Sequence, residues 1–201
     1  MRIEATKRWS GLDWLLAGLT VAYFAVVAIW DLGDWVRSSA DAVGDGRVWV
    51  LFTSSLEVAG ELPLLQVILG AAVAAAVIAR EGPRLWWVVA LVGHVGSGLV
   101  AYGLIGLASL LDSESADRVA DESDYGVSCV LAASFGALAA SAALAVRRGS
   151  RRRADWAALA AGILGMLGLL PVSFGWYDVE HPISYVLGAA VTWIVVNRRP
   201  L

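Results

Sequence analysis

Six long apolar segments, separated by clusters of charged residues, are the feature that most constrains how this chain can fold. They cover residues 14–30, 62–79, 85–111, 126–146, 156–176 and 179–196. Each is about as long as a helix that crosses a hydrocarbon core of roughly 30 Å. With 59% hydrophobic and 16% charged residues, the chain has too little polar surface to cover a soluble globule. We therefore expect an all-α membrane protein, a single transmembrane domain of six helices over residues 1–201.

The distribution of charge predicts the orientation of the six segments. If they alternate across the bilayer, 12 of the 15 basic residues share one side: Arg2, Lys7, Arg8, Arg80, Arg84, Arg147, Arg148, Arg151, Arg152, Arg153, Arg198 and Arg199. Only Arg37, Arg47 and Arg118 fall on the other side, where most of the acidic residues lie. Because Lys and Arg concentrate in cytoplasmic loops, we expect both termini in the cytoplasm and a multi-pass protein of the plasma membrane.

Two connections between the segments have distinct characters. Residues 80–84 form a short turn containing Gly82 and Pro83, so the second and third helices should be antiparallel neighbours. Residues 31–61 form the one long outer connection, in which tryptophan and β-branched residues are mixed with charge. This composition is typical of an ordered loop that lies in the headgroup region, so the lipid bilayer is an expected partner.

Composition also excludes several kinds of site. Cys129 is the single cysteine, which rules out an intramolecular disulfide, a CxxC redox pair and any multi-cysteine metal centre. We expect neither a metal nor a cofactor. A net charge of −3, without a concentrated basic face on a soluble domain, argues against nucleic acid as a partner.

Polar residues inside the apolar segments are the candidates for chemistry, because unpaired polar groups are costly in lipid. His94 lies about ten residues into the third segment. Ser128 lies just inside the outer end of the fourth, and His181 lies at the outer start of the sixth. A serine and a histidine at matching depth on separate helices are the minimum for a hydroxyl nucleophile with a general base.

Each of these residues also has a purely structural interpretation. Ser128 beside Gly126 is typical of close helix packing or of a hydroxyl bonded to the preceding turn. His181 is equally consistent with a solvated residue at a helix entry, and His94 with structural hydrogen bonding. Asp124, like Asp178, lies where a helix N-cap is expected.

Four segments in order resemble the rhomboid intramembrane serine proteases. Residues 49–65 resemble the family's passage from the first outer loop into the second helix, and residues 80–84 its short basic turn. Gly126-Val127-Ser128-Cys129 resembles the Gly-x-Ser motif of the fourth helix. His181, followed by Gly188, resembles the histidine and glycine of the sixth. The likeness covers roughly residues 10–198 and is greatest to divergent bacterial rhomboid-like proteins, often from actinobacteria.

The resemblance implies a six-helix rhomboid-like bundle with a Ser128/His181 dyad. His181 would act as general base and Ser128 as nucleophile on transmembrane-helix substrates, which would enter laterally and be cut near their outer ends. Gly126 would allow close approach at the nucleophile, and the Ser128 N–H would donate to the oxyanion. Asp124 and His94 are candidates for polar support or oxyanion stabilisation.

Two alternatives to the protease remain open, and the first rests on a departure from the family pattern. Where the family has a histidine and an asparagine as oxyanion donors, this chain has Pro63 and Val67, and neither has a side-chain donor. Losing one such donor typically lowers the rate about 100- to 1000-fold. The first alternative is a catalytically inactive rhomboid pseudoprotease that binds client transmembrane helices. The second is a small transporter or channel using His94, although no acidic residue lies deep in a span.

Overall fold

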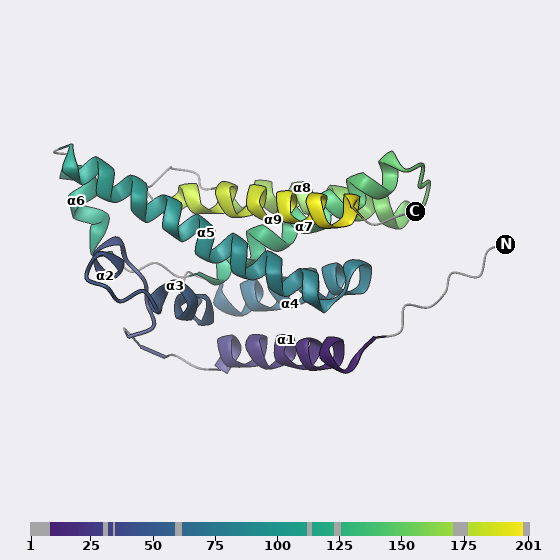
Figure 1. Ribbon diagram of the computed structural model, residues 1–201, viewed down its shortest axis with the longest axis horizontal. Coiled ribbons are helices and arrows are strands. Elements are labelled where there is room, and N and C mark those ends of the chain that lie inside the picture. The colour runs from purple at the N-terminus through teal and green to yellow at the C-terminus, as the bar shows by residue number, and fades with distance from the viewer. Residues whose placement is uncertain are drawn as a thin grey trace.

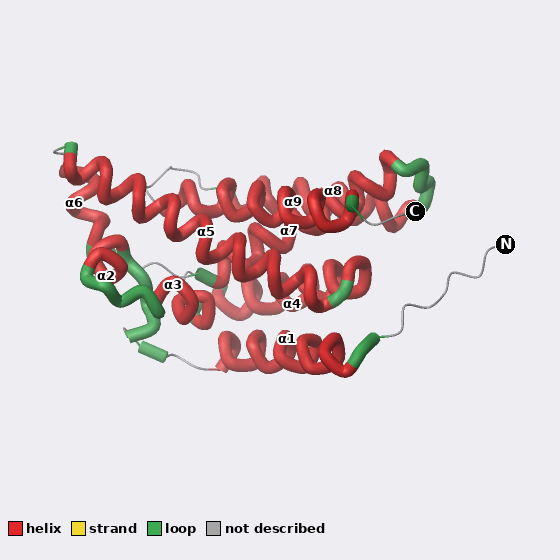
Figure 2. Tube along the Cα trace, viewed as in Figure 1, coloured by secondary structure: helices red, strands yellow, loops and turns green. Residues whose placement is uncertain are grey.

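The computed structural model describes residues 9–29, 32–33, 35–58, 62–111, 114–122, 126–170 and 177–198. Over these ranges the chain is all-helical, with short connections and no β-strand (Figure 1; Figure 2). The elements are α1 (Gly11–Ile29), α2 (Ala40–Gly44), α3 (Val50–Thr53), η1 (Ser54–Leu56), α4 (Pro63–Glu81), α5 (Pro83–Leu110), α6 (Glu114–Ala120), α7 (Val127–Arg147), α8 (Arg153–Leu169), η2 (Tyr177–Val179) and α9 (Glu180–Asn197).

Five helical segments of the described chain are long and apolar enough to cross a membrane, which indicates a membrane protein. They are α1, α4, α5, α7 and the continuous stretch Tyr177–Asn197 that contains α9. The predicted fifth segment, 156–176, differs from its helix. Helix α8 begins at Arg153 and ends at Leu169, after 17 residues, and residues 171–176 lie outside the described chain. Hydropathy alone does not mark the helix end, but Pro171 does, because proline has no N–H to continue the helix and disfavours a helical residue before it.

The turn between α4 and α5 is tighter than the five residues expected from the sequence. Helix α4 continues through Arg80 to Glu81, and α5 starts at Pro83, so Gly82 alone is non-helical. Its φ of 100° lies in the left-handed region that favours glycine. Pro83 suits the first position of a helix because its missing N–H has no intrahelical acceptor there. The two helices run in opposite directions, as the turn predicts (Figure 1).

Helix α7 is the centre of the bundle, in contact with α4, α5, α8 and α9. In its membrane-length window 83% of residues are buried, against 17% in the peripheral α1. Small residues allow the neighbouring helices to pack closely enough to bury α7. A Cβ on Gly188 would lie 2.2 Å from the Ala133 carbonyl oxygen, and one on Gly136 would lie 2.0 Å from that of Tyr185. The small residues of α7 and α9 therefore let the two backbones pack closely.

The outer connection is more structured than an interfacial loop. It contains α2, α3 and η1, and Ser39 caps α2 by accepting a hydrogen bond from the Ala42 N–H at 3.0 Å. One side of it is buried in the bundle, where Val50 and Ser54 are fully enclosed. The other side exposes apolar side chains, including Trp35, Trp49 and Phe52, as expected of a segment near headgroups. Helix α6, between α5 and α7, is an additional element that the apolar pattern does not predict.

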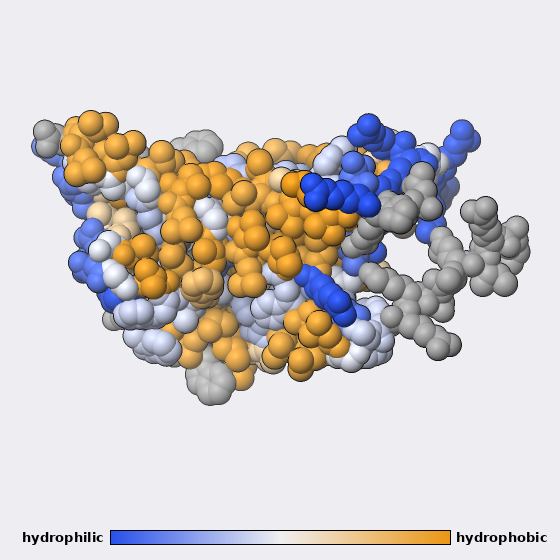
Figure 3. Space-filling view, viewed as in Figure 1, coloured by the Kyte–Doolittle hydropathy of each residue, from blue (hydrophilic) through white to orange (hydrophobic). Residues whose placement is uncertain are grey.

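Apolar and charged side chains occupy different parts of the surface. The face seen in Figure 3 carries a broad apolar area between charged residues at the two ends of the bundle. The beginning of α1 and the end of α9 lie at one of these ends, while α2, α3 and α6 lie at the other (Figure 1). Exposed leucine and isoleucine side chains on α4 and α5, such as Leu64, Ile68 and Leu99, belong to the apolar surface.

Candidate active site

Ser128 and His181 are in hydrogen-bond contact. The Nε2 atom of His181 lies 2.9 Å from the Oγ atom of Ser128, and both side chains are half-buried. The two residues are 53 positions apart in the chain and come from the first turns of α7 and α9. The structure therefore brings together the two residues whose matched depth suggested a nucleophile and a base.

The helix starts on either side of this contact position its two residues. Gly126 is the N-cap of α7, and its carbonyl accepts the N–H of Cys129 and Val130 at 3.1 and 3.2 Å. Ser128 follows in the first turn, at the positive end of the helix dipole. Helix α9 begins one residue before His181, with Val179 as its N-cap. The N-cap expected at Asp178 is therefore wrong, because the chain enters α9 through the short helix η2.

A second contact between the same turns involves Cys129 and Glu180, neither of which was a candidate site residue from the sequence. The thiol of Cys129 donates to Oε2 of Glu180 at 3.2 Å, and both residues are almost completely buried. Ser184, one turn further along α9, donates its hydroxyl to the Cys129 carbonyl at 2.6 Å. The charge pattern of the sequence predicts that Glu180 lies with the other acidic residues on the outer side. The position of Glu180 directly before His181 was the available signal that it lies near the site. Its burial could not be predicted, because it depends on how closely α9 packs on α7.

His94 lies beside the segment that leads into Ser128. Its Nε2 atom is 3.2 Å from the Oγ of Ser54, and both residues are buried. The Ser54 carbonyl accepts the Gly126 N–H at 3.1 Å. A Cβ on Gly126 would be 2.0 Å from Cε1 of the His94 ring, so the glycine allows the ring to pack against the backbone. This arrangement gives polar support to the loop before the serine, with Ser54 as a third member that sequence reasoning missed.

The remaining candidate positions are less informative. Asp124 lies outside the described residues. Pro63 is the exposed first residue of α4, and Val67 is buried in the apolar core with Val127 and Val130. No group of three or more His, Cys, Asp or Glu side chains within the described ranges is arranged to hold a metal ion.

Comparison with known proteins adds no assignment to this geometry. The chain matches no family of known proteins, no curated protein and no solved structure.

Proposed function

We propose that this chain is a rhomboid-like intramembrane serine protease in which Ser128 is the nucleophile and His181 the general base. The observation that carries the proposal is the 2.9 Å contact between Ser128 Oγ and His181 Nε2 at the start of two apolar helices. A hydroxyl attacks peptide bonds only when a neighbouring base removes its proton, and this distance is within hydrogen-bond reach.

The proposed membrane arrangement has six spans with both termini in the cytoplasm of the cell. Helix α8, with 17 residues, reaches about 26 Å at 1.5 Å per residue, near the lower limit for crossing a bilayer. Its exposed side chains include Trp156, Ile163, Leu164 and Leu167, which suits a lipid-facing helix. The basic residues around α8 and at the α4–α5 turn then face the cytoplasm, and the dyad lies toward the outer side.

The proposed reaction proceeds through an acyl-enzyme. With its proton on Nδ1, His181 accepts the Ser128 hydroxyl proton on Nε2 while Oγ bonds to the carbonyl carbon of the scissile peptide. The tetrahedral intermediate collapses as the C–N bond breaks, and the imidazolium returns that proton to the leaving amine. Water, deprotonated by His181, then attacks the ester and releases Ser128 with its proton restored. The Ser128 N–H, in the first turn of α7, is the proposed oxyanion donor.

A specific observation favours one alternative, a pseudoprotease that binds transmembrane helices without cutting them. Neither Pro63 nor Val67 has a side-chain donor for an oxyanion, and Val67 is packed in the core. In that alternative the Ser128–His181 contact is a structural tie between α7 and α9.

Labelling with a fluorophosphonate probe tests the proposal on the full chain in detergent. We expect the probe to modify the wild type and not the Ser128→Ala or His181→Ala variants. Ser115→Ala, which removes an exposed serine on α6, is the matched control and should label normally. Cleavage of reporter transmembrane peptides in liposomes should follow the same pattern. A folded wild type that neither labels nor cleaves would exclude the protease and leave the pseudoprotease.

A further inference from the structure

A polar pocket lies at the basic end of the bundle, opposite the candidate dyad. It has a volume of about 850 Å³ and lies where α4 and α7 end and α8 begins. Its charged and polar lining consists of Arg80, Glu81, Arg148, Ser150, Arg152 and Asp155. Three arginines and two carboxylates give this lining a net charge of +1 (3 − 2). In the proposed membrane arrangement, this end of the bundle lies at the level of the cytoplasmic lipid phosphates.

Arg80 is held in place from two sides. Its Nη1 atom is 2.8 Å from Oδ1 of Asp155, and its Nε donates to Oγ of Ser141 at 3.1 Å. Asp155 is fixed in turn by the Ser150 hydroxyl at 2.5 Å, and Ser141 donates to Glu81. Each carboxylate of the lining is thus engaged with a neighbouring group. The network orients the Arg80 guanidinium before any ligand binds.

Arg148 is exposed and is anchored by a hydrogen bond to the end of α9. Its Nη2 atom donates to the Val196 carbonyl at 3.0 Å, which ties the turn after α7 to the end of α9. A guanidinium has five N–H donors. In the described part of the chain, the hydrogen bonds of Arg80 use two of its nitrogens and those of Arg148 use one. Both side chains therefore have donors left for an acceptor in the pocket.

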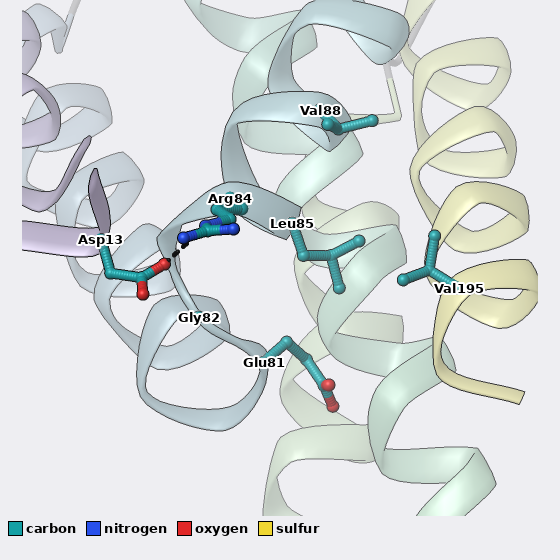
Figure 4. Close-up of a pocket in the computed structure, with 7 residues that line it drawn as sticks. All are labelled: Asp13, Glu81, Gly82, Arg84, Leu85, Val88 and Val195. Atoms are coloured by element: carbon teal, nitrogen blue, oxygen red, sulfur yellow. Dashed lines mark hydrogen bonds and ion pairs between the residues drawn. The ribbon is translucent and has the colours of Figure 1, made fainter. Parts of the chain in front are cut away.

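The adjacent pocket at this end of the bundle has the opposite balance of charge. It has a volume of about 450 Å³, shares Glu81 as a lining residue, and contains Arg84 (Figure 4). There Arg84 is bonded to Oδ1 of Asp13 at 2.8 Å and to the Ser10 hydroxyl at 2.7 Å. Its single arginine is outnumbered by two carboxylates, Asp13 and Glu81, and the rest of its lining is apolar. The larger pocket, by contrast, has an excess of guanidinium groups.

We infer that the larger pocket binds an anionic phosphate group, with the headgroup of an acidic phospholipid as its ligand. Guanidinium groups bind phosphate oxygens in pairs of parallel hydrogen bonds, and basic pockets between membrane helices accept such headgroups. Arg80 is the pre-oriented donor, Arg148 supplies further donors, and Arg152 adds positive charge at the exposed rim of the pocket. The inference is independent of the proposed proteolysis.

Thermal unfolding of the purified full chain in a neutral detergent tests this site. Phosphatidylglycerol should raise the Tm by several degrees, about 3 °C at ten times its Kd, while phosphatidylcholine should not. The Arg148→Gln/Arg152→Gln variant should lose most of this shift. Arg151→Gln/Arg153→Gln is the matched control, since it removes the same charge from the same exposed turn outside the pocket. It should retain the shift.

Three outcomes would overturn the inference. The first is an absence of any phosphatidylglycerol effect on the wild type. The second is an equal loss of the shift in both double variants, which indicates diffuse attraction to a basic surface. The third is a full shift with inorganic phosphate alone, which identifies free phosphate as the ligand. The Tm in phosphatidylcholine checks folding, and the single variant Arg148→Gln replaces the double variant if that one is unfolded.

Discussion

The thiol of Cys129 donates a hydrogen bond to Oε2 of Glu180 at 3.2 Å. Cys129 directly follows Ser128 and Glu180 directly precedes His181, so this bond lies beside the contact between Ser128 and His181. Two adjacent residue pairs thus join the same turns of α7 and α9. One pair is half-buried and the other is almost completely buried. Since a buried carboxylate is costly unless it is hydrogen-bonded, the inner pair constrains how α9 sits on α7, and with it the orientation of His181.

Glu180→Ala should lower the reactivity of Ser128, although it changes neither Ser128 nor His181. The change removes the thiol's acceptor and leaves a cavity, at a cost of about 2 kcal/mol in the free energy of unfolding. We expect fluorophosphonate labelling of Ser128 to slow by about tenfold, since 1.4 kcal/mol of lost orientation has that effect. Cys129→Ser, which keeps a donor for Glu180, should label at close to the wild-type rate. Unchanged labelling of folded Glu180→Ala would show that the inner pair does not position His181.

Gly126→Ala should be destabilising because of His94. The new Cβ would be 2.0 Å from Cε1 of a ring that is 5% exposed, so ring or backbone must move, at about 1–3 kcal/mol. The backbone of Gly126 is right-handed helical (φ −84°), so the clash and not the dihedral is the cause. A double-mutant cycle with His94→Ala measures the coupling. If Gly126→Ala lowers the free energy of unfolding equally with and without the His94 ring, the contact with His94 does not cause the destabilisation.

Gly188→Ala should separate α9 from α7. Its Cβ would meet the Ala133 carbonyl oxygen at 2.2 Å, and a backbone atom has little freedom to yield. We expect a loss of at least about 2 kcal/mol and, because the dyad bridges these helices, a matching loss of labelling. Gly103→Ala on α5 is the control, since nothing lies within 4 Å of its Cβ and alanine favours helix. Thermal unfolding of both variants should give a lower Tm for Gly188→Ala than for Gly103→Ala. Equal Tm values would contradict the packing argument.

Arg37→Met should destabilise the outer connection. Arg37 Nε bonds Oε2 of Glu57 at 2.8 Å, and the Glu57 side chain is 5% exposed. The pair is only partly buried, since the Arg37 side chain is 25% exposed, and removing the guanidinium should cost about 1–3 kcal/mol because the Glu57 carboxylate loses a charged donor. Glu57 also accepts the Leu32 N–H at 3.1 Å, so the start of the loop should loosen. Faster proteolysis of the outer loop would report this, and Arg37→Met/Glu57→Gln should recover part of the loss.

The helices were largely predictable and their contacts were not. The charge clusters between apolar runs place the boundaries of α4, α5 and α7 within a few residues, because a helix in lipid must satisfy its backbone over an apolar length. Helix α6 and the short helices of the outer connection have no such signal. The apolar pattern also misses the end of α8, for which Pro171 was the available signal.

The sequence by itself determined that this is an apolar helical chain with its basic residues concentrated in a few connections, because hydropathy and charge act locally along the chain. It also placed Ser128 and His181 at similar depth. Only the tertiary structure decided that they touch, that Glu180 is buried beside them, and that His94 supports the segment before Ser128 through Ser54. Those contacts depend on the rotation and separation of α5, α7 and α9, which are set by where glycine and alanine allow backbones to meet.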